Sequence, residues 1–162
     1  NLKKTLLLIP QGTIDDVIRL LKVCSAILQE NIQIRIRLHP ALQKDKRTLL
    51  QIKRLSQNIK NRKNFVLSKK SILHDMKSSS HFLYTSSTAA LECISFGLTP
   101  IHYNYHSFSE DSLDGYNIPN KFQAYTPYDV SKIMSFKIPL NYKETIVNYH
   151  KNSFDLEFLL NQ

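Results

Sequence analysis

The sequence predicts an α/β fold: a doubly wound, mainly parallel sheet of five or six strands with helices on both faces. Short apolar runs alternate with amphipathic stretches along the chain, and this alternation is typical of strands joined by helices. Parallel neighbours need such helical crossovers, because a tight turn cannot return the chain to the starting edge of the sheet. The 162 residues suffice for one domain, spanning residues 1–162, with a single core.

The first half of the chain alternates between strand and helix patterns. A buried type of strand ends at Pro10, and the turn Gln11-Gly12-Thr13 follows it. Apolar residues then recur at helical spacing on one face, whereas the period of two that begins at Ile32 indicates a strand. We expect strands at residues 5–9, 32–38 and 64–67, and helices at residues 14–28, 41–59 and 72–76.

The second half continues this alternation. A helical pattern that begins near Ser87 ends at Gly97, a residue type that often closes helices in the left-handed conformation. We expect strands at residues 81–85, 100–105 and 122–125, and helices at residues 87–96, 127–134 and 142–160. The polar stretch of residues 106–121 is expected to be a surface loop.

One face of the second predicted strand is polar. Gln33, Arg35 and Arg37 alternate on that face, although a central parallel strand is usually apolar on both faces. We therefore expect this face either to be thinly covered or to open onto a ligand.

The net charge of +9 favours negatively charged partners for this protein. Basic residues are spread along the chain and are densest between Lys44 and Lys70. A nucleic-acid surface is one explanation, but an anionic membrane face or phosphorylated substrates explain the same charge. We expect a cytoplasmic protein with possible peripheral contact at the inner membrane face, and we place nucleic acid below these partners.

The two cysteines argue against a disulfide or a metal site, and the apolar runs are too short for a membrane-spanning helix. Cys24 and Cys93 each lie within an apolar helical pattern and show no metal-ligand spacing, so we expect buried free thiols in a reducing compartment. No apolar run approaches the ~20 residues that a membrane-spanning helix needs. No metal site and no cofactor are predicted.

Four of the predicted strands end in loops that suit a phosphate group. Ligands of doubly wound sheets bind beyond the carboxyl ends of the strands. Gly12 permits close approach of the backbone, and Arg37 and His39 share one face. Ser and Thr hydroxyls and a basic side chain supply hydrogen-bond donors. The candidate residues in these loops are Gly12, Thr13, Arg37, His39, Ser68, Lys69, Ser86, Ser87 and Thr88.

Each of these residues also has a structural explanation. Ser86 or Ser87 could cap the helix that follows without binding any ligand. His39 could be a surface histidine in a turn before proline. His102 and His106 flank the fifth predicted strand, near the edge where a sugar or base could stack.

Two short motifs carry a family resemblance. Residues 85–92, Thr-Ser-Ser-Thr-Ala-Ala-Leu-Glu, continue to Gly97-Leu98-Thr99-Pro100-Ile101, and Arg37-Leu38-His39-Pro40 precedes them. Together these segments resemble the C-terminal, donor-binding domain of GT-B glycosyltransferases. The pattern is most similar to bacterial surface-polysaccharide enzymes of the sialyl-, polysialyl- and Kdo-transferase-like groups, which carry a His-Pro motif and a downstream Ser-Ser motif.

The resemblance implies roles for particular residues. In those families the histidine and the hydroxyl pair hold the nucleotide phosphates, which implies this role for His39, Ser86 and Ser87. His39 would then be the catalytic residue, because it would stabilise the charge on the departing nucleotide. It further implies that Glu92 contacts the ribose and that residues 67–69 meet the base. The Gly-x-x-Pro spacing departs from the family's Gly-x-Pro. The lack of a second acidic residue before Glu92 favours an inverting transfer.

The expected function is therefore that of a Rossmann-like nucleotide-sugar-binding domain of a glycosyltransferase. The donor is expected to be of the CMP or UDP type, and the acceptor a bacterial surface polysaccharide or glycolipid held by an N-terminal domain outside these residues. Because the chain starts at Asn1 beside its first strand, we expect part of a longer two-domain enzyme that is inactive alone. Two alternatives stay open: a non-catalytic module that binds a protein or nucleic acid through its basic helix, and a sugar-nucleotide epimerase.

Overall fold

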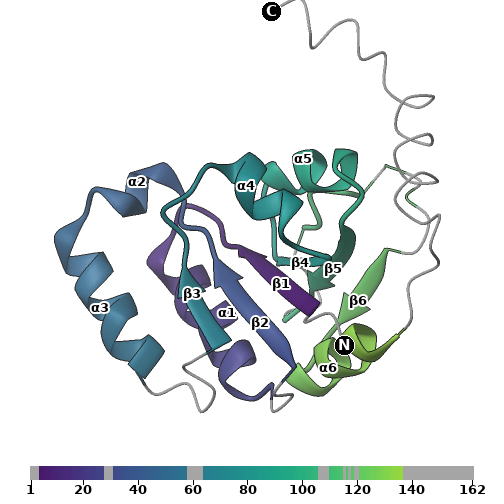
Figure 1. The fold of residues 1–162 in the computed structure, drawn as a ribbon, viewed down its shortest axis with the longest axis horizontal. Coiled ribbons are helices and arrows are strands. Elements are labelled where there is room, and N and C mark those ends of the chain that lie inside the picture. The colour runs from purple at the N-terminus through teal and green to yellow at the C-terminus, as the bar shows by residue number, and fades with distance from the viewer. Residues whose placement is uncertain are drawn as a thin grey trace, which may run out of the picture.

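The computed structural model describes residues 4–27, 31–57, 64–105, 110–114, 116, 118 and 121–136. Its strands form one parallel sheet in the order β3-β2-β1-β4-β5-β6 (Figure 1). They are β1 (Lys4–Ile9), β2 (Ile32–Ile36), β3 (Phe65–Leu67), β4 (His81–Tyr84), β5 (Thr99–Tyr103) and β6 (Phe122–Ala124). The order reverses between β1 and β4, which confirms the predicted doubly wound, Rossmann-like α/β class.

Helices cover both faces of this sheet. They are α1 (Ile14–Ser25), α2 (Pro40–Gln43), α3 (Lys46–Gln57), α4 (Ile72–Lys77), α5 (Ala89–Ser95) and α6 (Pro127–Ser135). Alternate side chains of β1 enter opposite cores. Leu6 and Leu8 pack with apolar residues of α1, α3 and α6, whereas Leu7 and Ile9 pack with those of α4 and α5. Each such buried side chain stabilises the fold by about 1.5–3 kcal/mol.

Helix ends follow local signals in the sequence. The Thr13 hydroxyl accepts a hydrogen bond from the Asp16 N–H and so caps α1. Gly97, with φ 74°, ends α5, where the N–H groups of Gly97 and Leu98 donate to the carbonyls of Ile94 and Cys93. This pair of bonds is a Schellman motif and confirms the predicted helix end.

Two predicted helices differ from those observed. The stretch expected as one helix at residues 41–59 is two helices, because the Asp45 carboxylate accepts the backbone N–H groups of Arg47 and Thr48 and starts α3 anew. The helix expected from residue 87 begins at Ala89 with Thr88 as its N-cap, and no side chain caps it, so neither Ser86 nor Ser87 is the cap. The helix predicted at residues 142–160 lies outside the described residues.

The stretch predicted as a surface loop, residues 106–121, is partly buried. Leu113 and Ile118 belong to the core on the α5 side of the sheet. The buried Asp111 accepts the Tyr84 hydroxyl at 2.8 Å and the Lys121 ammonium at 2.7 Å. Burial acts to raise the pKa of Asp111, but these donors outweigh it and hold the pKa below its ordinary value.

The structure changes the interpretation of His102, which lies on β5. His102 is 1% exposed and lies against Tyr84, with ring centroids 5.3 Å apart. It therefore packs inside the protein. The expectation that His102 stacks on a sugar or base is wrong, because its ring is not accessible. His106 lies outside the described residues.

The remaining predictions about class can be compared directly. Cys24 and Cys93 are free and buried, as expected, and burial raises the pKa of both thiols. In the described part of the chain, no helix combines the length and apolar character needed to cross a bilayer.

Candidate functional site

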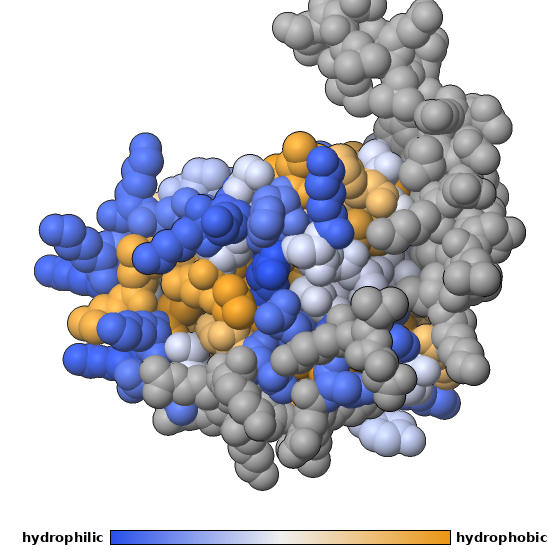
Figure 2. Space-filling view, in the orientation of Figure 1, coloured by the Kyte–Doolittle hydropathy of each residue, from blue (hydrophilic) through white to orange (hydrophobic). Residues whose placement is uncertain are grey.

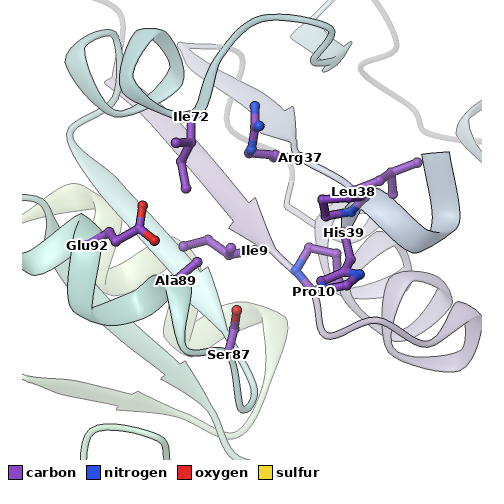
Figure 3. Close-up of a pocket in the computed structure, with 10 residues that line it drawn as sticks. Ile9, Pro10, Arg37, Leu38, His39, Ile72, Ser87, Ala89 and Glu92 are labelled. Atoms are coloured by element: carbon purple, nitrogen blue, oxygen red, sulfur yellow. The ribbon is translucent and has the colours of Figure 1, made fainter. Parts of the chain in front are cut away.

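A pocket of about 220 Å³ lies at the carboxyl edge of the sheet, beside the point where the strand order reverses. Doubly wound sheets bind ligands at this switch point. Side chains from the ends of β1 and β2, from α4 and from the α5 region surround it (Figure 3). The lining residues are Ile9, Pro10, Arg37, Leu38, His39, Pro40, Ile72, Ser87, Ala89 and Glu92.

The imidazole of His39 is oriented by the start of α2. Its Nδ1 accepts a hydrogen bond from the Ala41 N–H at 3.2 Å, so the neutral ring carries its proton on Nε2. Gly12 lies beside the ring, and a Cβ added there would meet Nδ1 at 3.4 Å, which is ordinary van der Waals contact. The result is a fixed imidazole that offers Nε2–H as a donor.

Arg37 is held at the pocket wall by a buried carboxylate. Its Nη1 donates to Asp75 Oδ2 at 3.2 Å and to the Lys70 carbonyl at 2.6 Å. Asp75 is fully buried in α4, and it also accepts Arg35 Nη1 at 3.3 Å and the Ser68 hydroxyl at 2.7 Å. Ion pairs with Asp75 of α4 thus cover the polar face of β2 at Arg35, and Arg37, which directly follows β2, also lines the pocket.

A second buried carboxylate joins the two strands that flank the switch point. Asp16 of α1 is 3% exposed. It accepts the Gln11 N–H at 2.7 Å and the Thr85 hydroxyl at 2.8 and 2.9 Å. Gln11 follows β1 and Thr85 follows β4, so Asp16 fixes the relative position of the two loops that border the pocket.

Ser87 and Glu92 face the pocket from the α5 side. Figure 3 shows the Ser87 hydroxyl and the Glu92 carboxylate directed toward the space opposite Arg37 and His39. The Ser87 carbonyl accepts the Ser112 hydroxyl at 2.9 Å, which ties this loop to the partly buried 110–114 segment. The pocket therefore presents cationic and N–H donors on one side and a hydroxyl and a carboxylate on the other.

The sequence-predicted residues divide into two groups. Arg37, His39, Ser87 and Glu92 line one pocket, and Gly12 lies beside its histidine. The others do not line it: Thr13 caps α1, Ser68 donates to Asp75, Lys69 and Thr88 are exposed, and Ser86 is half-buried.

Sequence reasoning missed the two carboxylates that position the site and most of its apolar walls. A signal for Asp75 existed, because two arginines on one strand face require a counter-charge. No comparable signal pointed to Asp16, which resembles an ordinary first-turn acid. Within the described residues, no group of three or more His, Cys, Asp or Glu is placed to hold a metal ion.

Comparison with known proteins yields structural likeness only. No family model matches the sequence, and no curated protein matches it. One similar solved structure is the UDP-GlcNAc 2-epimerase from Neisseria meningitidis bound to UDP-GlcNAc, with 16% identity, a TM-score of 0.56, and coverage of 100% of this chain and 45% of that chain.

A second similar structure is the catalytic domain of cholesterol-α-glucosyltransferase from Helicobacter pylori, with 17% identity and a TM-score of 0.49, covering 93% of this chain and 97% of that chain. At 16% identity the likeness to the epimerase shows a shared fold. The chain spans less than half of the epimerase's length.

Proposed function

We propose that this chain is the donor-binding domain of a glycosyltransferase and binds a nucleotide sugar of the CMP or UDP type in the pocket beside the switch point. The observation that carries the proposal is the convergence of Arg37, His39, Ser87 and Glu92 on one cavity at that point. The UDP-GlcNAc bound by the similar epimerase supports a nucleotide sugar as the ligand class.

The chemistry of the pocket suits a phosphate and a ribose. The Arg37 guanidinium and the His39 N–H would donate to phosphate oxygens, and hydrogen bonds to a charged acceptor are the strong ones. Ser87 would add a hydroxyl donor, while Glu92 would accept hydrogen bonds from ribose hydroxyls. The cavity of about 220 Å³ is smaller than the ~300–1,000 Å³ of most ligand pockets. It would therefore hold this part of the donor, and the sugar would lie over the open edge.

His39 is the proposed catalytic residue. Transfer displaces the nucleotide from the anomeric carbon, and negative charge develops on the departing phosphate. A donor fixed before the reaction stabilises that charge without reorganisation, and such stabilisation supplies much of the rate enhancement in many enzymes. We propose an inverting displacement onto a surface polysaccharide or glycolipid. Glu92, the acidic residue among those that line the pocket, is assigned to the ribose, so the base for the acceptor would come from another part of the enzyme.

Replacing His39 tests the proposal. His39→Asn keeps a side chain that can cap α2, since asparagine is a preferred N-cap, but it removes the Nε2–H donor. We expect CMP or UDP to bind about 10- to 100-fold more weakly, because a hydrogen bond to a charged group contributes about 1.5–3 kcal/mol. Calorimetric titration measures this. His74→Asn on the exposed side of α4 is the matched control. Unchanged affinity in His39→Asn would refute the assignment.

A second candidate function is that of a sugar-nucleotide epimerase, which the fold likeness brings forward. The two activities differ in their need for an acceptor. We expect the 162 residues alone to bind the donor without transferring sugar, because orientation of two reactants can account for about 7–11 kcal/mol of the barrier. Joining an acceptor-binding domain should restore acceptor-dependent transfer. Conversion of the nucleotide sugar without any acceptor would favour the epimerase instead.

A further inference from the structure

The outer face of α3 combines an exposed leucine with basic side chains. Leu50 is 51% exposed, whereas Ile52 is 1% exposed. Two residues turn a helix by about 200°, so these side chains point in opposite directions. Positions three and four residues away are the surface neighbours of a helical residue. At all four such positions around Leu50 stand exposed cations. We call this set the α3 patch: Lys46, Arg47, Leu50, Lys53 and Arg54.

Within the described residues little negative charge offsets this patch, and Asp45 is the acidic side chain whose charge acts on one of its cations, Arg47. Residues 46–57 contain no Asp or Glu. Asp45 precedes them, but its carboxylate accepts the backbone N–H groups of Arg47 and Thr48 at the start of the helix. Among the described residues, no ion pair involves any of the four patch cations. The patch is therefore a concentrated positive surface on a chain whose net charge is already +9.

We propose that the α3 patch docks this chain onto an anionic lipid bilayer. Four cations would face the lipid phosphates, and each basic residue near such a surface strengthens binding by about fivefold. Leu50 would enter the boundary between headgroups and acyl chains, where apolar side chains of interfacial helices lie. Figure 2 shows hydrophobic atoms over α3 between projecting hydrophilic side chains.

The exposed Leu50 favours a lipid bilayer over nucleic acid as the partner of the α3 patch. A phosphate backbone would attract the same four cations, and the attraction would depend on salt in the same way. It would leave Leu50 in contact with charge and water, with no gain from its apolar surface. A bilayer can bind both the leucine and the cations of the patch, because the apolar side chain leaves water while the cations stay at the headgroups.

Docking through α3 would set the position of the pocket. The short helix α2 directly precedes α3 in the chain and packs against it. Pro40 of α2 and the adjoining His39 line the pocket. The carboxyl edge of the sheet would therefore lie near the bilayer. The docking inference itself does not depend on the proposed nucleotide-sugar function.

Sedimentation with vesicles tests the patch. The 162-residue chain is mixed with phosphatidylcholine vesicles that contain or lack phosphatidylglycerol. We expect binding only with phosphatidylglycerol, and weaker binding at high salt. K53Q/R54Q should lower the partition coefficient by about tenfold or more. L50N, which keeps every charge, should lower it by about fivefold, as expected for a half-exposed leucine.

Matched controls lie on other helices. K77Q/K132Q removes two exposed cations from α4 and α6, and L73N replaces a leucine that is 42% exposed on α4. Both should bind within about twofold of the unmodified chain. All substituted positions are exposed or half-exposed, and melting curves verify that the variants fold.

Several results would overturn the inference. These are equal binding to vesicles without phosphatidylglycerol, the same loss in K77Q/K132Q as in K53Q/R54Q, and binding by L50N equal to that of the unmodified chain. A parallel titration uses labelled single-stranded RNA and DNA. Binding to these strands that K53Q/R54Q weakens and L50N does not, without vesicle binding, would assign the patch to nucleic acid and reject the lipid surface.

Discussion

Asp75 shows how one residue links stability to the candidate site. A buried charge is costly unless it is paired and hydrogen-bonded. The fully buried Asp75 carboxylate meets this condition, because one oxygen accepts from Arg35 and Ser68 and the other from Arg37. Since Arg37 also lines the pocket, the same ion pair that satisfies Asp75 sets the position of a proposed phosphate donor.

Asp75→Asn should destabilise the protein. Asparagine keeps the shape of the side chain but leaves two guanidinium groups without their counter-charge. The arginine side chains are 14% and 22% exposed, so water relieves part of the cost. We expect a loss of about 3 kcal/mol, at the lower end for a broken buried pair. Urea denaturation measures it. Glu110→Gln, at an exposed position, should stay within about 0.5 kcal/mol. A similarly small effect of Asp75→Asn would show that the pair adds nothing to the fold.

At the scale of elements, the segment of residues 110–114 is attached to the sheet by polar contacts as well as by its apolar residues. Asp111 binds the hydroxyl of Tyr84 on β4, and it also accepts the backbone N–H of Leu113 at 2.9 Å. Lys121, directly before β6, donates to Asp111 and to Asp114. Asp111 therefore links β4, the segment of residues 110–114 and Lys121 directly before β6.

Asp111→Asn should loosen this segment selectively. The variant loses the charge that Lys121 and Tyr84 bind, and we expect a cost of about 1.5–3 kcal/mol. Hydrogen exchange at the Leu113 amide should accelerate more than exchange in β1. Asp114→Asn provides the comparison, because Asp114 binds the same lysine but its side chain is 71% exposed, and such pairs contribute about 0–1 kcal/mol. Equal exchange in both variants would contradict the role given to Asp111.

For the whole molecule, His81 makes the stability depend on pH. Its imidazole is 1% exposed on the central strand β4. Burial, and to a smaller degree the charge of Lys4, lower the pKa of His81 from 6.5 to about 4. The unfolded chain therefore takes up a proton at a higher pH than the folded chain does. The contribution of His81 to the free energy of unfolding is fully present above pH 6.5 and is lost progressively as the pH falls toward 4.

Between pH 6.5 and pH 4, His81 is expected to lower the free energy of unfolding by about 3 kcal/mol. This loss appears as the difference between the unfolding free energies of the native chain and of His81→Gln, measured across the same pH series. Taking the difference removes the contribution of titrating carboxylates. His74→Gln, at an exposed histidine, is the matched control for the substitution itself. Parallel profiles for the native chain and His81→Gln would mean that His81 does not titrate differently on folding.

Several elements could be predicted because their signals are local. Short apolar runs, and a period of two in the stretch that forms β2, located the six strands of the described residues within a few positions, and Gly97 marked the end of α5. Errors arose where one local signal competed with another. The apolar period ran on past Asp45, but the carboxylate of that residue binds the backbone and divides the stretch into two helices.

The α/β class and the edge of the sheet where Arg37, His39 and Ser87 would meet could be predicted from the sequence, because parallel strands place all their carboxyl ends on one side. Which charges are paired, in contrast, depends on the three-dimensional arrangement of the elements. Asp75 meets arginines some 40 positions away, and Asp16 meets Thr85 across 69 positions. Local periodicity shows which face of an element is buried, but the partner of a buried charge depends on how the crossovers order the strands, and no short stretch of sequence contains that information.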